Sequence, residues 1–528
     1  MKTEDESRPH DTDVIIAGAG PVGLSLALEL GVRGVDCTVV ERRDGSVPVP
    51  RMSGVSTRNM EYCRRWGIAD EVKNAVWSST HPMDFVYVTN LCGDEIARLE
   101  VPSYAARGVL PFSPEGPCPC PQIFFDPILA KHAASLESVT MRYDTQLEGF
   151  AQDDHGVTAQ VTDRASGNRE ALTSAYLVGC DGPGGVVRPA LGIELDGPGV
   201  IAQSVNIFFR TPDLVSLHDK GWAKFYRLID DGGCWAELIA IDGIELWRLT
   251  VFHEFSSGMD AEAYLEKAVG RDFPCEIIDA SPWERRDYVA RSYGEGRVFI
   301  AGDAAHQNSP TGGLGMHTGV GEAGNLAWKL AAMLDGWGGP GLLATYETEC
   351  RPIAVRNVEL STAAFRHITS IPGADAARET LEDNDPKLDS LTISEQTRTQ
   401  YCYENSPICI ADGTPPPPDT GQFIASARPG TRAPHAWINP ETSMLDRFGD
   451  GFVLLRLADE PPDGDPLAEA ASGLDMPLEI IDVADADIAA LYERALVLVR
   501  PDGHVAWRDD AAPADPRALL ERVSGHGP

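Results

Sequence analysis

Three glycines near the start of the chain, Gly18, Gly20 and Gly23, are spaced as Gly-x-Gly-x-x-Gly. In a turn between a strand and a helix, the first glycine permits a tight bend. The second lets a pyrophosphate approach the backbone, and the third lets the helix lie close to the strand. Glu41 follows about 20 residues later, where a carboxylate can accept hydrogen bonds from ribose hydroxyls. These residue types predict a dinucleotide site.

The elements that must position this loop are a strand, a helix and a second strand. Val14–Ala17 is an apolar run typical of a buried parallel strand, and Pro21–Gly31 has the apolar positions of a packed helix. Asp36–Val40 then returns as a strand. This βαβ unit predicts an α/β fold. It does not distinguish FAD from NAD, because both carry a pyrophosphate and riboses.

Two later strands also end in residues suited to a cofactor. Tyr176–Gly182 is an apolar run that ends in Asp181-Gly182, and Arg297–His306 contains a second that ends in Gly302-Asp303. The second leads into Pro310–His317, with the sequence Pro-Thr-Gly-Gly-Leu-Gly-Met-His, and then into a long helix. The nucleotide-binding chemistry therefore resumes after residue 297.

Together these motifs resemble those of the single-component FAD-dependent aromatic hydroxylases, the family of p-hydroxybenzoate hydroxylase and phenol hydroxylase. The resemblance extends over approximately residues 12–360. It implies FAD as the cofactor, NADH or NADPH as the electron donor and O2 as the oxidant. The residues it assigns to cofactor binding are Gly18, Gly20, Pro21, Gly23, Glu41, Arg42, Arg51, Gln122, Asp181, Gly182, Asp303, Pro310, Gly313, Leu314, Gly315 and Met316.

The resemblance also implies individual roles. Asp303 would bind the ribityl chain, and Gly313–Met316 would lie beside the isoalloxazine, where helix-start amides stabilise negative charge on the reduced ring. Asp181-Gly182 would contact both FAD and the nicotinamide donor. Arg51 would reach the pyrophosphate, with Arg58 as the alternative. Gln122 would contact the ribityl or phosphate region.

The implied reaction is hydroxylation of a phenol or another electron-rich ring through a flavin C4a-hydroperoxide. Baeyer–Villiger insertion or epoxidation on the same scaffold is an alternative. A flavoprotein reductase or dehydrogenase, and a flavin-binding module without activity, are alternatives of other classes. A second Gly-x-Gly-x-x-Gly before a βαβ unit is absent from the sequence. A donor that binds transiently, as in the family, fits this absence, and it leaves NADH or NADPH open.

The residues that contact the substrate are predicted less directly. His317 occupies the position after Gly-Leu-Gly-Met where relatives commonly have Asn, and a histidine there could titrate near neutral pH. The alternative is that only its backbone amide matters. The other candidates lie on or beside strands expected in the substrate domain, and they are Tyr226, Arg227 and His253, followed by His81 and Asp84.

Strand patterns and the resemblance predict three domains. Ser204–Arg210, Trp235–Ile241 and Leu246–Phe252 are typical of antiparallel strands. Pro429–His435 and Val499–Trp507 resemble the thioredoxin-like tail of the phenol hydroxylase branch. The predicted ranges are 1–80, 105–185 and 285–370 for a discontinuous Rossmann-like FAD-binding domain, 81–104 and 186–284 for a mixed-sheet substrate domain, 371–418 for a helical linker segment and 419–528 for the C-terminal domain.

Composition restricts the partners. The net charge of −36 disfavours nucleic acid and anionic lipid, because phosphate binding needs clustered Lys and Arg. The sequence has 11 cysteines but no Cys-x-x-Cys, and Cys118 and Cys120 lack further metal ligands nearby. We therefore expect a cytoplasmic enzyme without a metal or a membrane segment, acting on a small aromatic substrate. Its C-terminal domain, lacking redox cysteines, would be structural or support a homodimer.

Overall fold

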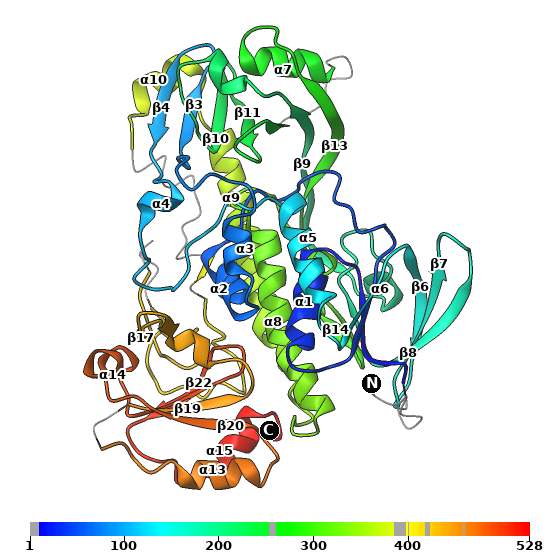
Figure 1. Cartoon of the computed structure of the whole chain (residues 1–528), viewed down its shortest axis with the longest axis vertical. Coiled ribbons are helices and arrows are strands. Elements are labelled where there is room, and N and C mark those ends of the chain that lie inside the picture. Colours follow the sequence, from blue (N-terminus) through cyan, green and yellow to red (C-terminus); the bar gives the residue numbers. More distant parts are fainter. Residues whose placement is uncertain are drawn as a thin grey trace.

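The computed structural model of the chain describes residues 10–252, 260–384, 398–399, 401–417, 423–457 and 460–527. Three larger sheets and one two-stranded pair are present in these ranges. Figure 1 shows the sheet that contains β3 (Phe85–Val88), β10 (Phe225–Asp230) and β11 (Gly233–Ala240) at the top, which we call the second sheet. A group of long helices lies at the centre beside the first sheet, which contains β8 (Arg169–Gly179), and the C-terminal sheet lies at the bottom.

The first sheet contains the βαβ unit expected from the sequence. β1 (Thr12–Ala17), α1 (Pro21–Gly31) and β2 (Cys37–Val40) follow one another, and β1 pairs in parallel with β2. The sheet order is β14-β15-β8-β1-β2-β5, with a β6–β7 hairpin extending from β8. The other strands are β5 (Val139–Arg142), β6 (Thr145–Gln152), β7 (Val157–Asp163), β8 (Arg169–Gly179), β14 (Gly294–Glu295) and β15 (Val298–Ile300). A late segment thus completes the sheet, which confirms the discontinuous α/β fold.

Four helices pack beside this sheet. They are α1, α5 (Gln122–Ala133), α8 (Leu314–Leu334) and α9 (Thr345–Thr369), and they form the centre of the molecule in Figure 1. α8 can approach α1 closely because Gly319 has no side chain. A Cβ at that position would lie 2.5 Å from the Val22 side chain and 3.0 Å from the Gly302 Cα. This contact brings the start of α8 next to the glycine loop.

The second sheet has the order β16-β13-β9-β12-β11-β10-β3-β4. Its strands are β3 (Phe85–Val88), β4 (Glu95–Leu99), β9 (Leu195–Arg210), β10 (Phe225–Asp230), β11 (Gly233–Ala240), β12 (Leu246–Val251), β13 (Glu276–Ala290) and β16 (His306–Gln307). The three predicted antiparallel strands correspond to β9, β11 and β12. In Figure 1, the long strands β9 and β13 run from this sheet down toward the central helices.

One face of the second sheet is directed at the FAD-binding region. Because side chains alternate along strands, Phe208 on β9 and Ile239 on β11 point to one side and Phe209 and Leu238 to the other. Phe208 and Ile239 pack in one apolar cluster with Val49, which follows β2, and Ile123, which lies on α5. We call this side of the sheet, lined by Phe208 and Ile239, the inner face.

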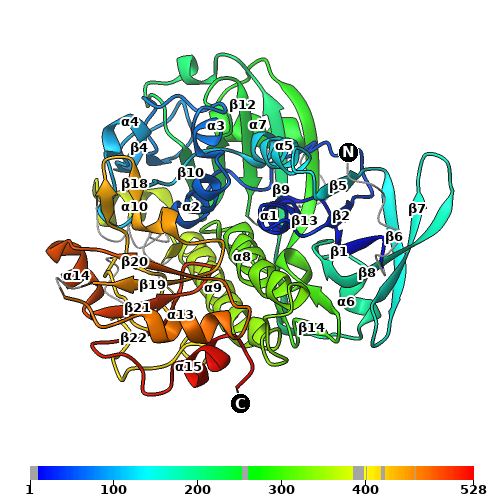
Figure 2. The same cartoon turned by 60° about the horizontal axis from the view of Figure 1, so that its bottom comes forward.

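The C-terminal region forms its own four-stranded sheet in the order β20-β19-β21-β22. It consists of β19 (Phe452–Arg456), α13 (Asp465–Ser472), β20 (Leu478–Asp482), α14 (Ala486–Tyr492), β21 (Leu496–Val499), β22 (Val505–Asp509) and α15 (Pro516–Val523). Figure 2 shows it beside α8 and α9. The sequence has no cysteine after Cys409, so dithiol redox chemistry is excluded there.

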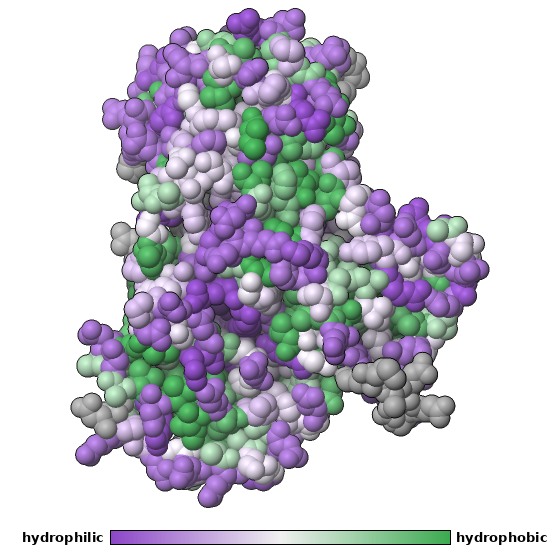
Figure 3. Space-filling view, viewed as in Figure 1, coloured by the Kyte–Doolittle hydropathy of each residue, from purple (hydrophilic) through white to green (hydrophobic). Residues whose placement is uncertain are grey.

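The remaining elements are short connections. They are α2 (Thr57–Arg65), α3 (Ala69–Lys73), α4 (Tyr104–Arg107), α6 (Val187–Ala190), α7 (Ala261–Val269), α10 (Ala374–Thr380), the 3-10 turns η1 (Leu214–Leu217), η2 (Gly302–Ala304) and η3 (Met444–Arg447), and the pair β17 (Trp437–Asn439) and β18 (Thr442–Ser443). Within the described residues, no helix is long and apolar enough to cross a membrane. Hydrophilic side chains cover much of the face in Figure 3.

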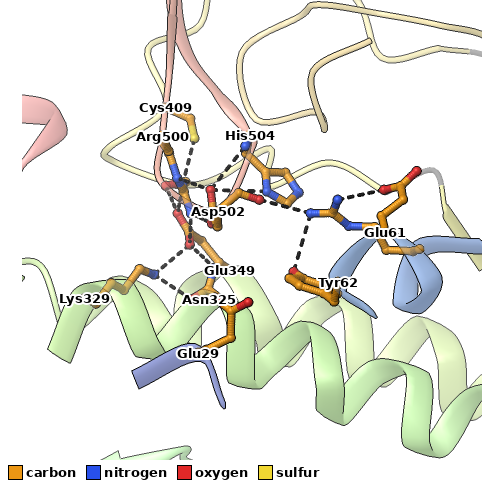
Figure 4. Close-up of polar contacts among 12 residues, drawn as sticks. Glu29, Glu61, Tyr62, Asn325, Lys329, Glu349, Cys409, Arg500, Asp502 and His504 are labelled. Carbon is orange, nitrogen blue, oxygen red and sulfur yellow. Dashed lines mark hydrogen bonds and ion pairs between the residues drawn. The ribbon is translucent and has the colours of Figure 1, made fainter. Parts of the chain in front are cut away.

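A buried group of charges joins the C-terminal region to the central helices (Figure 4). Arg500 lies 2.5 Å from Glu349 and 2.5 Å from Asp502, and Lys329 lies 2.7 Å from Glu349. We call these four residues the interdomain ionic cluster. Its side chains are at most 1% exposed. Leaving one of these buried charges without its partner would be costly, so the ion pairs favour contact between the two regions.

Candidate active site

The predicted glycine loop has the geometry of a phosphate-binding turn. Gly18 has φ +103°, and a Cβ there would lie 2.5 Å from the Cys180 carbonyl oxygen. A Cβ on Gly23 would lie 2.0 Å from the Gly18 carbonyl oxygen. At Gly20, the N-cap of α1, a Cβ would meet nothing within 4 Å. The space in front of this helix N-terminus therefore fits a pyrophosphate.

Glu41 is oriented toward this loop by two backbone amides. Its Oε2 accepts a hydrogen bond from the Ala19 N–H at 2.9 Å, and its Oε1 accepts one from the Arg43 N–H at 2.9 Å. Each carboxylate oxygen has a second lone pair that can accept from a ribose hydroxyl. The carboxylate is thus held at the end of β2, where the sequence predicts the ribose.

Asp181 has a clear structural partner. Its Oδ2 accepts hydrogen bonds from the N–H groups of Val186 and Val187 at 2.6 and 3.0 Å, at the start of α6. Burial raises its pKa, against these amides and the positive charge of Arg42, which lower it. Gly182 follows with φ +77°. The contact of Asp181 and Gly182 with FAD and the nicotinamide donor stays a prediction.

Asp303 lies on η2, directly after β15. Its side chain is exposed, whereas Gly302 and Ala304 on either side are buried. The surrounding protein nevertheless raises its pKa, and the charges of His306 and Arg51 oppose this. The exposed carboxylate is therefore accessible to ribityl hydroxyls, which could donate to it.

Arg51 and Gln122 meet, as the sequence could not show. The backbone N–H of Arg51 donates to Gln122 Oε1 at 3.2 Å, and Gln122 Nε2 donates to Asp126 Oδ2 at 2.9 Å. Arg58 is not a substitute for Arg51, because its guanidinium is buried against Glu61, Tyr62 and the Asp502 carbonyl. The alternative of Arg58 at the pyrophosphate is therefore wrong.

The segment predicted to lie beside the isoalloxazine forms a tight loop before α8. The Gly313 N–H donates to the Pro310 carbonyl at 2.9 Å, and Gly313 has φ +66°. α8 then begins at Leu314, so the amides of Leu314, Gly315 and Met316 belong to its first turn. First-turn amides have no partner within their helix. They are available to an electron-rich ring edge.

His317 faces the start of α2. Its Nε2 accepts a hydrogen bond from the Ser56 N–H at 3.1 Å. The imidazole nitrogen that accepts cannot carry a proton, so this bond favours the neutral ring. Its ring also lines a small cavity with Glu322, Asn357 and Tyr401. Its role toward substrate stays a prediction.

The structure does not bring the other substrate candidates together. Tyr226 points away from the inner face, and its hydroxyl donates to the Gly221 carbonyl and accepts from the Ala223 N–H. Arg227 is on the inner face but pairs with Glu237 at 3.2 Å and donates to the Tyr87 hydroxyl. Tyr226 therefore does not face the predicted substrate region. Side chains alternate along the strand, so its ring packs on the opposite side of the sheet, in the same cluster as Leu238 and Trp247. His253 lies outside the described residues.

His81 and Asp84 also have local partners. The His81 ring stacks on Trp222 with a centroid distance of 4.5 Å. Asp84 accepts from Arg98 at 2.7 Å and from the Val101 N–H at 2.9 Å. Both residues therefore stabilise the edge of the second sheet. In the part of the chain that the structure describes, no group of three or more His, Cys, Asp or Glu could hold a metal.

Two inner-face arginines, Arg248 and Arg285, were missed by the sequence analysis. Both are buried, at 7% and 1% exposure. Arg248 donates to the Pro50 carbonyl at 2.6 Å, and Arg285 donates to Ser309 Oγ at 3.1 Å. The contacted residues, Pro50 and Ser309, thus come directly before Arg51 and Pro310 in the sequence. The sequence signal was an arginine in the alternating strand Leu246–Val251.

The glycine loop and the α8 start supply hydrogen-bond donors, and Glu41 and Asp303 supply acceptors, in an arrangement that fits FAD. Two family models match the chain, "FAD binding domain" over residues 11–361 and "Aromatic-ring hydroxylase, C-terminal" over residues 426–527. The chain belongs to the FAD-dependent aromatic hydroxylases. The family expected from the motifs is thereby confirmed.

Among relatives of this aromatic hydroxylase is a putative polyketide hydroxylase of Streptomyces halstedii, 34% identical over 96% of this chain and 95% of the relative. Aklavinone 12-hydroxylase RdmE of Streptomyces purpurascens is 33% identical over 97% and 98%. The solved structure of the rebeccamycin biosynthetic enzyme RebC with reduced flavin has 38% identity and a TM-score of 0.91, covering 98% of this chain and 100% of RebC.

The aromatic hydroxylase is therefore an FAD-dependent monooxygenase. A ternary complex of aklavinone-11 hydroxylase with FAD and aklavinone has a TM-score of 0.81 and 30% identity, covering 98% of this chain and 99% of that one. FAD is the cofactor, and NAD(P)H and O2 are the co-substrates typical of the family. These relatives are named as monooxygenases and hydroxylases, so a reductase or dehydrogenase is disfavoured.

Proposed function

We propose that the enzyme hydroxylates a polycyclic phenol of the kind made in natural-product biosynthesis. The observation that carries the proposal is the apolar cluster between the inner face and the FAD-binding region, with Phe208, Ile239 and Ile241 opposite Val49 and Ile123. An apolar surface at this place suits a flat ring system beside the flavin. The relatives named for polyketides and aklavinone support the same substrate class.

Reduced FAD, when bound, supplies activation of O2 and transfer of one oxygen atom. The residues of this chain bind and shield it. Gly18–Gly23 and Arg51 would hold the pyrophosphate, Glu41 the ribose, and Asp303 the ribityl hydroxyls. The apolar cluster excludes water, which would otherwise divert the oxidant. We also propose the three-domain division from the sequence, with a thioredoxin-like C-terminal domain in a structural role.

The direct test is turnover with a panel of polycyclic phenols. Substrates should accelerate NADH or NADPH oxidation and yield a product that has gained one oxygen atom on a ring carbon, as shown by mass spectrometry and NMR. Oxidation of NAD(P)H without oxygen in any product would contradict the proposal. A ring-expanded lactone would instead identify Baeyer–Villiger insertion.

We further propose that the His317 side chain contributes to hydroxylation. Replacing it with asparagine should lower the fraction of NAD(P)H oxidation that yields product by about 100-fold, the lower end of the range for loss of a positioned proton donor or acceptor. The readouts are the ratio of product to NAD(P)H consumed and the FAD content. Unchanged coupling with full FAD content would show that only the backbone of residue 317 matters.

A further inference from the structure

The inner face of the second sheet carries more positive than negative charge. Its buried arginines are Arg227, Arg248 and Arg285, and Glu237 is the carboxylate beside them. Glu237 pairs with Arg227. In the described residues, neither Arg248 nor Arg285 has a carboxylate within 4.0 Å. This is unusual for a chain with a net charge of −36, because an unpaired buried charge is costly.

The existing partners of these two arginines are neutral. Arg248 donates from Nη1 to the Pro50 carbonyl, and its buried Nε has no hydrogen-bond partner among the described residues. Arg285 donates to the hydroxyls of Ser204, Ser309 and Thr311. Burial lowers the pKa of Arg248 to about 10 and that of Arg285 to about 9, against the charge of Glu237, which raises both. The two guanidinium groups thus retain positive charge that these neutral partners do not neutralise, and Arg248 retains an unused N–H donor.

Their position connects them to the flavin. Arg248 contacts the residue before Arg51, and Arg285 contacts the residues on both sides of Pro310. Between them on the same face, Thr250 donates to Asn206 at 2.9 Å. Aromatic rings flank the strip, since the Arg285 guanidinium lies 4.3 Å from the Phe365 ring centroid and 4.7 Å from that of Trp283. The positive charge of Arg248 also lowers the pKa of Arg285, so the two guanidinium groups lie near enough to interact electrostatically.

We propose that Arg248 and Arg285 form a subsite for a carboxylate carried by the aromatic substrate. This inference rests on the proposed function, because it names the chemistry of the same substrate. A carboxylate is favoured over a phenolate because its two oxygens match the forked donors of a guanidinium. The pyrophosphate of FAD is not the missing anion, since the glycine loop and the N-terminus of α1 supply its donors.

The test compares two probes that differ only in this group, 6-hydroxy-2-naphthoic acid and its methyl ester. Dissociation constants would be measured from the absorbance change of the oxidised holoenzyme, without turnover. The acid should bind at least about tenfold more tightly than the ester. Arg248→Met and Arg285→Met should each weaken acid binding by about 10- to 100-fold, as expected for a charged hydrogen bond, and leave ester binding nearly unchanged.

Arg210→Met is the matched control, because Arg210 is a half-exposed arginine of the same sheet that pairs with Glu245 and Glu276. It should change neither dissociation constant. The melting temperature gives a second readout. Among the described residues neither guanidinium pairs with a carboxylate, so the methionine variants should melt no lower than the Arg210 variant. Unfolding of both methionine variants would show that the charges are compensated, and would overturn the proposal.

Equal binding of acid and ester to the unmodified enzyme would overturn the carboxylate subsite alone. An acid preference that survives in both methionine variants would also overturn it. If neither probe perturbs the flavin and no phenol of the panel yields product, the proposed function fails, and the subsite fails with it. A lower affinity for the acid alone in the two variants would support the subsite.

Discussion

Replacing Glu349 with glutamine is expected to lower the free energy of unfolding by about 3 to 5 kcal/mol, the usual cost of removing one partner from a buried ion pair. Arg500 and Lys329 lie 2.5 and 2.7 Å from its carboxylate, and all three side chains are fully buried. Ser406 and Asn325 also donate to it. The change leaves two buried cations without their shared carboxylate. Calorimetry of the holoenzyme measures the effect.

Asp482→Asn is the control within the C-terminal sheet. Asp482 pairs with Arg456 at 2.5 Å, but its side chain is 62% exposed. Exposed pairs contribute about 0 to 1 kcal/mol, so this variant should melt close to the unmodified protein. Similar melting temperatures for the Glu349 and Asp482 variants would contradict the role assigned to the interdomain ionic cluster.

The ion pairs of Glu349 with Arg500 and Lys329 also predict a pH dependence of stability. Burial opposes the ionisation of Glu349, but the charges of Arg500 and Lys329 outweigh it and lower its pKa from 4.5 to about 2. The folded state therefore binds this proton less tightly than the unfolded state. The stabilisation is present above pH 4.5 and is lost as the pH falls toward 2. The unfolding free energies of the unmodified protein and Glu349→Gln should converge over this interval.

The cofactor and the family were predictable because their sequence signals are local. The glycine loop, Glu41 and the Gly302-Asp303 pair each follow a strand within a few residues, and parallel strands place such ends at one edge of a sheet. The sequence positions of β1, α1 and β2 follow the apolar pattern closely. Local chemistry and local geometry therefore agree, and the family could be recognised from them.

The substrate face was not predictable in the same way. Whether a strand residue faces the flavin depends on its parity within the strand, and Tyr226 and Arg227 are adjacent residues with opposite directions. Whether an arginine is paired depends on residues distant in sequence. Arg227 pairs with Glu237 on the next strand, whereas Arg248 has no carboxylate partner in the part of the chain that the structure describes. The Arg500–Glu349 pair likewise joins two regions that no local pattern connects.

Gly20→Val is expected to abolish tight FAD binding and to leave the apoprotein fold intact. Gly20 has φ −76° and ψ 177°, a conformation open to any residue, and a Cβ there would meet no protein atom within 4 Å. The added side chain would instead occupy the space in front of the α1 amides. Losing one or two charged hydrogen bonds to phosphate should weaken FAD binding by about 100-fold.

Fluorescence titration of the apoprotein measures this affinity, and its melting temperature measures the fold. Gly34→Ala provides the opposite control. Gly34 has φ +74° and open space around its Cβ position, so alanine costs about 1 to 2 kcal/mol of backbone strain without approaching the cofactor. Gly20→Val should lose FAD affinity but keep its melting temperature, and Gly34→Ala should have a lower melting temperature but keep its FAD affinity. If Gly20→Val kept its FAD, the pyrophosphate could not lie against this helix terminus, and the role of the loop would have to be assigned elsewhere.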